Sequence, residues 1–354
     1  MSLRTIAKQS KIHLIWIAAS FDFVSFLAMT MEKHNMKVVI LGSGELLTNL
    51  IAGCMDAGCN IVGVFRFEKV RLPLFKRLII DLFNPSKELT YIKSHKLYEI
   101  NAKSVNSAEF KKEILRLNAD IILVGSWGEK LKKSIIDLPK LATINAHPAL
   151  LPKYRGPNPY LQAIKHLEKE SGITFHLMDE NYDTGAILLQ KHVEIKQEDT
   201  GAELRHNIAL VARKGVCELL QTLDKEIIVP VNQDEKHASY FAQITEDEVM
   251  FDFSRNAEEV SAQIRAFYPW TKCYFQYNNH FFIPNPYKLE IVQENPSTIR
   301  PFDHSTIIAK SHHNRSITVL CGDGKLLKMQ GLELFGILKP LTKLYIKYRV
   351  KKSQ

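Results

Sequence analysis

Three polar residues in this chain have the types and spacing that acid–base chemistry requires. Asn145 and His147 stand two residues apart at the end of an apolar segment, and Asp183 follows 36 residues after the histidine. Side chains two apart on an extended chain project to the same side. An amide and an imidazole placed in this way could stabilise a developing oxyanion, and the histidine would do so best when protonated.

Asp183 could supply the carboxylate that raises the pKa of that histidine. It lies in the polar segment 179–185, which we expect to form a turn between two strands. A plainer interpretation also fits, in which Asn145 and His147 are only hydrogen-bonding groups of a loop. The residues alone leave both interpretations open.

The surrounding pattern predicts a doubly wound, mostly parallel α/β sheet. Apolar strands are expected at 37–41, 61–65, 96–100, 120–124 and 142–145, with helices at 46–54, 108–117 and 161–167. Strands at 172–178 and 186–195 precede a long helix that opens at Thr200, where Glu203 completes a capping box. Asn145 would then lie at the edge of the sheet where such folds bind ligands.

The Gly42-Ser43-Gly44 turn after the first strand resembles part of a dinucleotide-binding fingerprint. Residue 47 is Leu, so the third glycine of that motif is missing. We therefore favour a structural turn between strand and helix over a nicotinamide site.

The pattern changes after residue 228, which suggests a second domain. Residues 229–240 are polar and break the periodicity, and we interpret them as a linker. Beyond them come one helix at 258–267 and several short strands with tight turns. The predicted organisation is an N-terminal extension at 1–35, a catalytic domain at 36–228, the linker, and a smaller β-rich, OB-like barrel domain at 241–354.

The charge of the chain is concentrated at its ends. Of 354 residues 24% are charged and the net charge is +9, but the tail from Lys339 onward carries six positive charges and no acid. A net positive charge favours a polyanionic partner such as nucleic acid. If the partner is RNA, we expect its phosphates at this tail; otherwise the tail is only a solvated end. The five cysteines show no metal spacing, which favours a reduced compartment without a metal site.

Residues 13–31 form a strongly apolar segment after a basic start. A targeting or membrane segment is one interpretation. Asp22 interrupts the run, however, and Met36 stands immediately before the first predicted strand. An extension upstream of the natural start at Met36 is therefore the favoured interpretation.

The motifs together resemble the folate-dependent formyltransferases. The resemblance is carried by Asn145-x-His147, the following Leu-Leu-Pro and Arg-Gly, and the Asp-Thr-Gly that begins at Asp183. It runs from about residue 36 to 330. Within the family the chain is most similar to members that formylate the initiator methionyl-tRNA, because segments 251–254 and 264–270 match their second domain.

The resemblance implies transfer of a formyl group from 10-formyltetrahydrofolate to an amine, without a metal. Asn145 and His147 would stabilise the tetrahedral intermediate, and Asp183 would tune the histidine and help to move protons. The folate would lie against the loop of Ala149, Leu150, Leu151 and Pro152. The acceptor would contact Arg155, Gly156, Lys69 and Arg71.

Departures from the family pattern leave the acceptor open. The family loop usually has serine where this chain has Ala149, and the basic segment 66–77 lacks the glycines of the tRNA-specific members. Residues 155–160 also resemble formyltransferases that act on nucleotide-linked amino sugars. Besides methionyl-tRNA we therefore retain an amino sugar as acceptor, and a non-catalytic RNA-binding relative as a third alternative. We expect a cytoplasmic monomer without a DNA or membrane partner.

Overall fold

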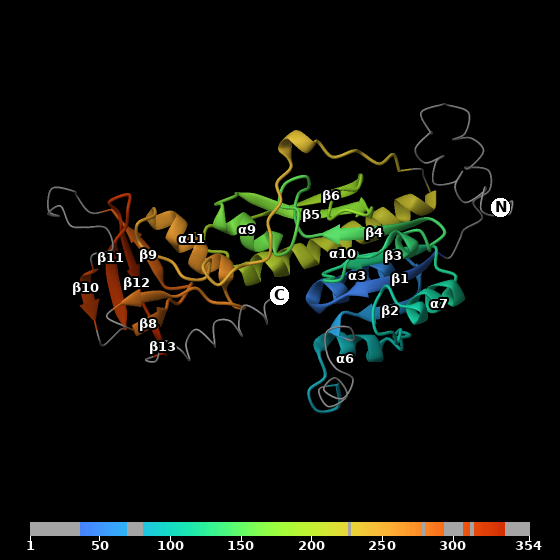
Figure 1. The fold of residues 1–354 in the computed structure, drawn as a ribbon, viewed down its shortest axis with the longest axis horizontal. Helices are drawn as coiled ribbons and strands as arrows, with labels where there is room; N and C mark the ends of the chain where they lie inside the picture. The colour runs from blue at the N-terminus through green and yellow to red at the C-terminus, as the bar shows by residue number, and fades with distance from the viewer. Residues whose placement is uncertain are drawn as a thin grey trace.

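A computed structural model describes residues 36–68, 81–225, 228–277, 280–293, 307–311 and 315–336. The N-terminal extension, the basic tail, Lys69 and Arg71 lie outside the described residues. Two folded units lie side by side, one built on a mixed sheet and one rich in short strands (Figure 1).

The first unit is a six-stranded sheet in the order β2-β1-β3-β4-β5-β6. The strands β1 to β4 pair in parallel, whereas β5 and β6 are antiparallel additions at one edge. The strands are β1 (Lys37–Gly42), β2 (Asn60–Arg66), β3 (Ile121–Gly125), β4 (Ala142–His147), β5 (Glu170–Leu177) and β6 (Ile187–Glu194). The predicted mostly parallel sheet is confirmed.

Helices cover both faces of this sheet, so its central strands are apolar on both sides. In β1, Val38 and Ile40 face one core while Val39 and Leu41 face the other. The first core includes residues of α3 (Gly44–Asp56), α6 (Lys87–Ser94), α9 (Pro159–Lys165) and α10 (Gly201–Lys225). The second is closed by α7 (Ala108–Leu117) and α8 (Lys133–Ile136).

The long helix α10 begins at the predicted capping box. Glu203 accepts a hydrogen bond from the Thr200 N–H at 3.0 Å, and the Thr200 hydroxyl accepts one from the Ala202 N–H at 3.2 Å. Two of the free N–H groups at the helix start are thereby satisfied. The start of α10 abuts the second unit, because a Cβ added to Gly201 would lie 2.3 Å from the Ala266 carbonyl oxygen.

The second unit is the smaller β-rich domain that the sequence predicts. Its helix α11 (Ala257–Phe267) packs against α9 and presents a buried face that includes Val260, Ile264 and Phe267. The described strands pair antiparallel as two sheets, β10-β11-β12-β9 and β13-β8-β7. They are β7 (Phe275–Tyr277), β8 (His280–Ile283), β9 (Leu289–Val292), β10 (Ile307–Ser311), β11 (Ser316–Leu320), β12 (Leu326–Met329) and β13 (Glu333–Gly336).

An extended chain joins the two units, interrupted by the short 3-10 helix η1 (Glu235–His237). It includes the predicted linker, and Val231 exchanges backbone hydrogen bonds with Ile187 of β6 at 2.8 Å. Within the described ranges no helix is long and apolar enough to cross a bilayer.

Candidate active site

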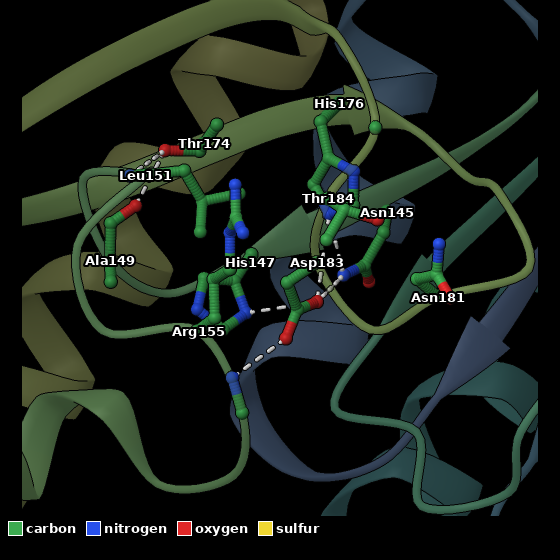
Figure 2. A network of polar contacts seen from close by, with 12 residues as sticks. Asn145, His147, Ala149, Leu151, Arg155, Thr174, His176, Asn181, Asp183 and Thr184 are labelled. Atoms are coloured by element: carbon green, nitrogen blue, oxygen red, sulfur yellow. Dashed lines mark hydrogen bonds and ion pairs between the residues drawn. The ribbon is translucent and has the colours of Figure 1, made fainter. Parts of the chain in front are cut away.

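The three residues singled out from the sequence meet at the carboxyl end of β4 (Figure 2). Asn145 and His147 are on β4 itself, and Asp183 comes from the turn between β5 and β6. Asp183 has a positive φ of 58°, a conformation that aspartate adopts more readily than most residues. The turn thereby points its carboxylate back toward the strand.

The carboxylate of Asp183 is the centre of the cluster. Its Oδ2 accepts the Gly156 N–H at 2.9 Å, and its Oδ1 accepts an Asn145 amide N–H at 3.1 Å. Oδ1 also lies 3.5 Å from His147 Nδ1 and 3.7 Å from His176 Nε2. Burial alone would raise the pKa of Asp183, but the positive charge that His147 can carry, the contacts of His176 and the Gly156 N–H together hold it well below its usual range.

His147 is buried, with a hydrogen-bond acceptor beside each ring nitrogen. Nε2 lies 2.8 Å from the Tyr154 carbonyl oxygen, and Nδ1 faces Asp183. Burial lowers the pKa of His147 below its ordinary value, although Asp183 and the Tyr154 carbonyl act in the opposite direction. Asp183 therefore does raise the pKa of His147, as expected, but the loss of hydration has the larger effect and the net shift is downward. Since a carbonyl oxygen can only accept, we assign the proton of the neutral ring to Nε2, which leaves Nδ1 as the basic nitrogen.

His176 is a member of the cluster that the sequence interpretation missed. It lies opposite Asn145 in the antiparallel pairing of β5 with β4, and its Nε2 is 3.1 Å from the Asn145 amide nitrogen. Its Nδ1 is 2.8 Å from the Leu177 carbonyl oxygen. The signal for it was a histidine within an otherwise mostly apolar buried strand. Because Nδ1 of His176 faces a carbonyl oxygen, we assign the proton of its neutral ring to Nδ1, so that Nε2 accepts an Asn145 amide N–H and both N–H groups of Asn145 have partners inside the protein.

The loop predicted to hold the folate is fixed by Thr174 of β5. The Thr174 hydroxyl donates to the Ala149 carbonyl at 2.6 Å and accepts the Leu151 N–H at 3.1 Å (Figure 2). Ala149 and Leu151 are buried, while Leu150 and Pro152 are partly exposed. Leu150 and Pro152 are consequently the side chains of this loop that remain available to a ligand.

Arg155, for which the sequence predicts a substrate contact, is directed toward the extended segment instead. Its guanidinium donates to Gln233 Oε1 at 2.8 and 3.1 Å and to the Glu235 carboxylate at 2.7 and 2.9 Å. The side chain is buried, and a buried charge is stable only with such partners. The neighbouring Gly156 contributes its backbone N–H to Asp183. Gly156 has φ 96°, and a Cβ there would meet the Phe241 carbonyl oxygen at 2.3 Å.

Residues 229–240, which we call the strap, therefore connect both loops of the site. Gln233 donates to the carbonyl oxygens of Asp183 and Gly185 at 2.9 and 2.8 Å. Ser239 accepts the Tyr154 N–H at 2.8 Å through its hydroxyl and the Arg155 N–H at 2.8 Å through its carbonyl. The strap thus fixes the turn that carries Asp183 relative to the loop that follows His147.

Replacement of Gln233 by alanine should destabilise the protein and reduce its activity together. Two carbonyl oxygens would lose their donor and Arg155 would lose one acceptor, at a cost of about 1–3 kcal/mol for each group left unpaired. Urea denaturation measures the change, and Gln221→Ala on an exposed position of α10 is the matched control. Equal stability of the two variants would show that the strap does not support the site.

The difference in unfolding free energy between the wild type and Asp183→Asn should depend on pH. Because the folded-state pKa lies below the ordinary value of 3.8, the ionised carboxylate stabilises the fold above that pH. This contribution is lost as the pH falls through the folded-state pKa. We expect the difference to be largest near neutral pH and to shrink below about pH 4, as measured by chemical denaturation. A difference that stays constant with pH would contradict this assignment.

Comparison with known proteins identifies the family. Residues 36–220 match the model of the formyl transferases, and residues 243–334 match the formyl transferase C-terminal domain. The chain belongs to the formyl transferase family. This formyltransferase shares 30% identity over 291 residues with the methionyl-tRNA formyltransferase of Stutzerimonas stutzeri, covering 82% of this chain and 88% of that protein. It shares 31% identity over 295 residues with the methionyl-tRNA formyltransferase of Clostridium novyi, covering 82% and 90%.

Solved structures at lower identity share the fold of this formyltransferase. The N-formyltransferase from Helicobacter canadensis, solved in complex with folinic acid and dTDP-3-aminofucose, is 19% identical with a TM-score of 0.59. The alignment covers 83% of this chain and 99% of that one. Within the described residues no group of three or more His, Cys, Asp or Glu side chains is arranged to hold a metal ion.

Proposed function

We propose that this formyltransferase transfers the formyl group of 10-formyltetrahydrofolate to the amino group of initiator methionyl-tRNA. The observation that carries the proposal is the convergence of Asn145, His147 and His176 on the partly buried carboxylate of Asp183. The names of the relatives at 30–31% identity support methionyl-tRNA as the acceptor. In this proposal residues 36–228 form the catalytic domain of a cytoplasmic monomer, and residues 241–354 form the second domain.

The reaction forms a bond between the amine nitrogen and the formyl carbon and breaks the bond from that carbon to N10 of the folate. The formyl oxygen carries a negative charge in the tetrahedral intermediate, the amine loses a proton, and N10 gains one. Donors aimed at such an oxygen lower the barrier. Because both N–H groups of Asn145 have internal partners, one of them must be released to the oxyanion when the substrates bind.

His147 would accept the transferred proton, and Asp183 would stabilise the resulting positive charge. Nδ1 of His147 is the basic nitrogen of the neutral ring and lies 3.5 Å from the Asp183 carboxylate. A proton accepted at Nδ1 would therefore be stabilised by the carboxylate, and the resulting imidazolium could stabilise the oxyanion or protonate N10. The low pKa of Asp183 keeps its carboxylate ionised in the free protein near neutral pH.

A nucleotide-linked amino sugar is the second candidate acceptor. Gly156-Pro157-Asn158-Pro159-Tyr160 departs from the pattern of the tRNA-specific members, and Asn158 adopts a positive φ of 56° immediately before α9. Incubation of the protein with 10-formyltetrahydrofolate and either charged initiator tRNA or amino-sugar nucleotides separates the candidates. Formylation of the sugar alone would refute the tRNA proposal. Absence of formylation of either acceptor would favour a non-catalytic relative.

A further inference from the structure

Arg205 brings a guanidinium group to the junction of the two folded units. It lies near the start of α10 and contacts Tyr160 of α9 and Trp270, which follows the end of α11. Its guanidinium carbon is 5.0 Å from the ring centre of Trp270 and 6.0 Å from that of Tyr160. The two rings are 5.6 Å apart and are themselves partly exposed. Aromatic rings hold the plane of an arginine in this way through cation–π contact.

The guanidinium has no ion pair or hydrogen bond to any residue that the structure describes. Two nearby acids are engaged with other groups: Glu45 contacts His206 at 2.5 Å, and Glu88 accepts the Gly44 N–H at 2.8 Å. The side chain of Arg205 is only partly buried. Its N–H donors are therefore free to bind an anionic group that a ligand brings.

Arg205 lies along the same sheet edge as the Asp183 cluster. A Cβ added to Gly44, the first residue of α3, would lie 2.6 Å from an Arg205 guanidinium nitrogen. Gly42 at the end of β1 and Asn145 of β4 flank the end of β3 on its two sides. Gly42 and Asn145 are therefore two strand spacings apart, roughly 10 Å, and an acceptor strand that reaches the cluster could also pass Arg205.

We propose that Arg205 binds a phosphate group in the terminal nucleotides of the acceptor RNA. The planar guanidinium fork matches the geometry of phosphate oxygens. Trp270 and Tyr160 fix the fork and offer ring surface to an unstacked base, which is how proteins commonly bind single-stranded RNA ends. The inference rests on the proposed transfer to methionyl-tRNA and adds the residue that would position its acceptor end.

Arg205→Ala tests this proposal through the kinetics of the acceptor. The KM for methionyl-tRNA should rise about ten- to a hundredfold, as expected for loss of a charge-assisted hydrogen bond. The KM for 10-formyltetrahydrofolate should be unchanged, and the slope of log affinity against log salt should fall by about 0.7 for one phosphate. Arg205→Lys should recover only part of the affinity, because it keeps the charge but not the fork.

Arg213→Ala on the same helix is the matched control, because Arg213 pairs with Asp56 at 2.6 Å on an exposed surface.

Calorimetric binding of inorganic pyrophosphate provides a readout that needs no activity. Pyrophosphate binding that is lost in Arg205→Ala shows that Arg205 binds phosphate even if the wild type formylates no tRNA, in which case the assignment of that phosphate to RNA fails together with the proposed acceptor. Formylation of tRNA by wild type and variant with equal KM, together with unchanged pyrophosphate binding, would overturn the inference and leave the proposed function intact. Equal rises in both KM values with a lower Tm would also overturn it, because they indicate a structural role.

Discussion

Replacement of Asp183 by asparagine is expected to lower kcat by about a thousandfold or more. The substitution preserves the shape of the side chain but removes the charge that faces His147 Nδ1 at 3.5 Å. A proton accepted by His147 would then lack a counter-charge in a buried site. The new amide group would also place a donor or a weaker acceptor opposite the Asn145 and Gly156 N–H groups. Single-turnover formylation of methionyl-tRNA at saturating substrates measures the effect on the chemical step.

Asp234→Asn provides a control of the same chemistry at an exposed position. Asp234 caps η1 on the strap and contacts His237, without any contact to the cluster. It should retain nearly wild-type kcat. If Asp183→Asn also retained more than about a tenth of the wild-type rate, the carboxylate could not have the role proposed for it.

Replacement of His147 by alanine is expected to lower kcat by about a hundred- to ten-thousandfold. Within the described cluster, Nδ1 of His147 faces Asp183, whereas Nε2 of the other imidazole, His176, also lies 3.1 Å from the Asn145 amide nitrogen and is therefore less available to a proton. Loss of the His147 ring removes both the site that takes up the proton and the cation that would stabilise the oxyanion. The KM for 10-formyltetrahydrofolate should change much less than kcat.

The control for this substitution is His192→Ala, since His192 lies on the exposed side of β6 and its ring pairs with Glu170, away from the cluster. Added imidazole provides a second test. If His147 acts through its ring nitrogen, free imidazole should restore part of the rate of His147→Ala but leave Asp183→Asn unchanged. Rates near those of the wild type in His147→Ala would refute the assignment.

The position of the site was predictable because it depends on strand ends. Apolar runs with glycine-rich or polar ends define β1, β3 and β4, and two residues on one extended strand must share a face. Asn145 and His147 were therefore found together, and Asp183 followed from the polar turn between the next two strands. His176 required the antiparallel register of β5 with β4, which a sequence pattern does not specify.

The pKa of His147 and the contacts of Arg155 could not be predicted from the sequence, because both depend on residues that are distant along the chain. The pKa of His147 is set by how completely the ring is buried, and that burial comes from side chains distant in sequence. Arg155 pairs with Gln233 and Glu235, which lie 78 and 80 residues away. The polarity of the strap indicated a linker, but only the folded chain shows which loops its side chains bind.

The strap also means that the two units are not interchangeable modules. A chain ending with α10 would keep the whole sheet and all four residues of the cluster, yet its buried Arg155 would lose both Gln233 and Glu235. The turn carrying Asp183 would lose its side-chain amide donor as well. Acceptor specificity could therefore not be exchanged between relatives by joining domains at the end of α10. The strap would have to be transferred together with the catalytic unit, because the geometry of the site depends on the segment that connects the domains.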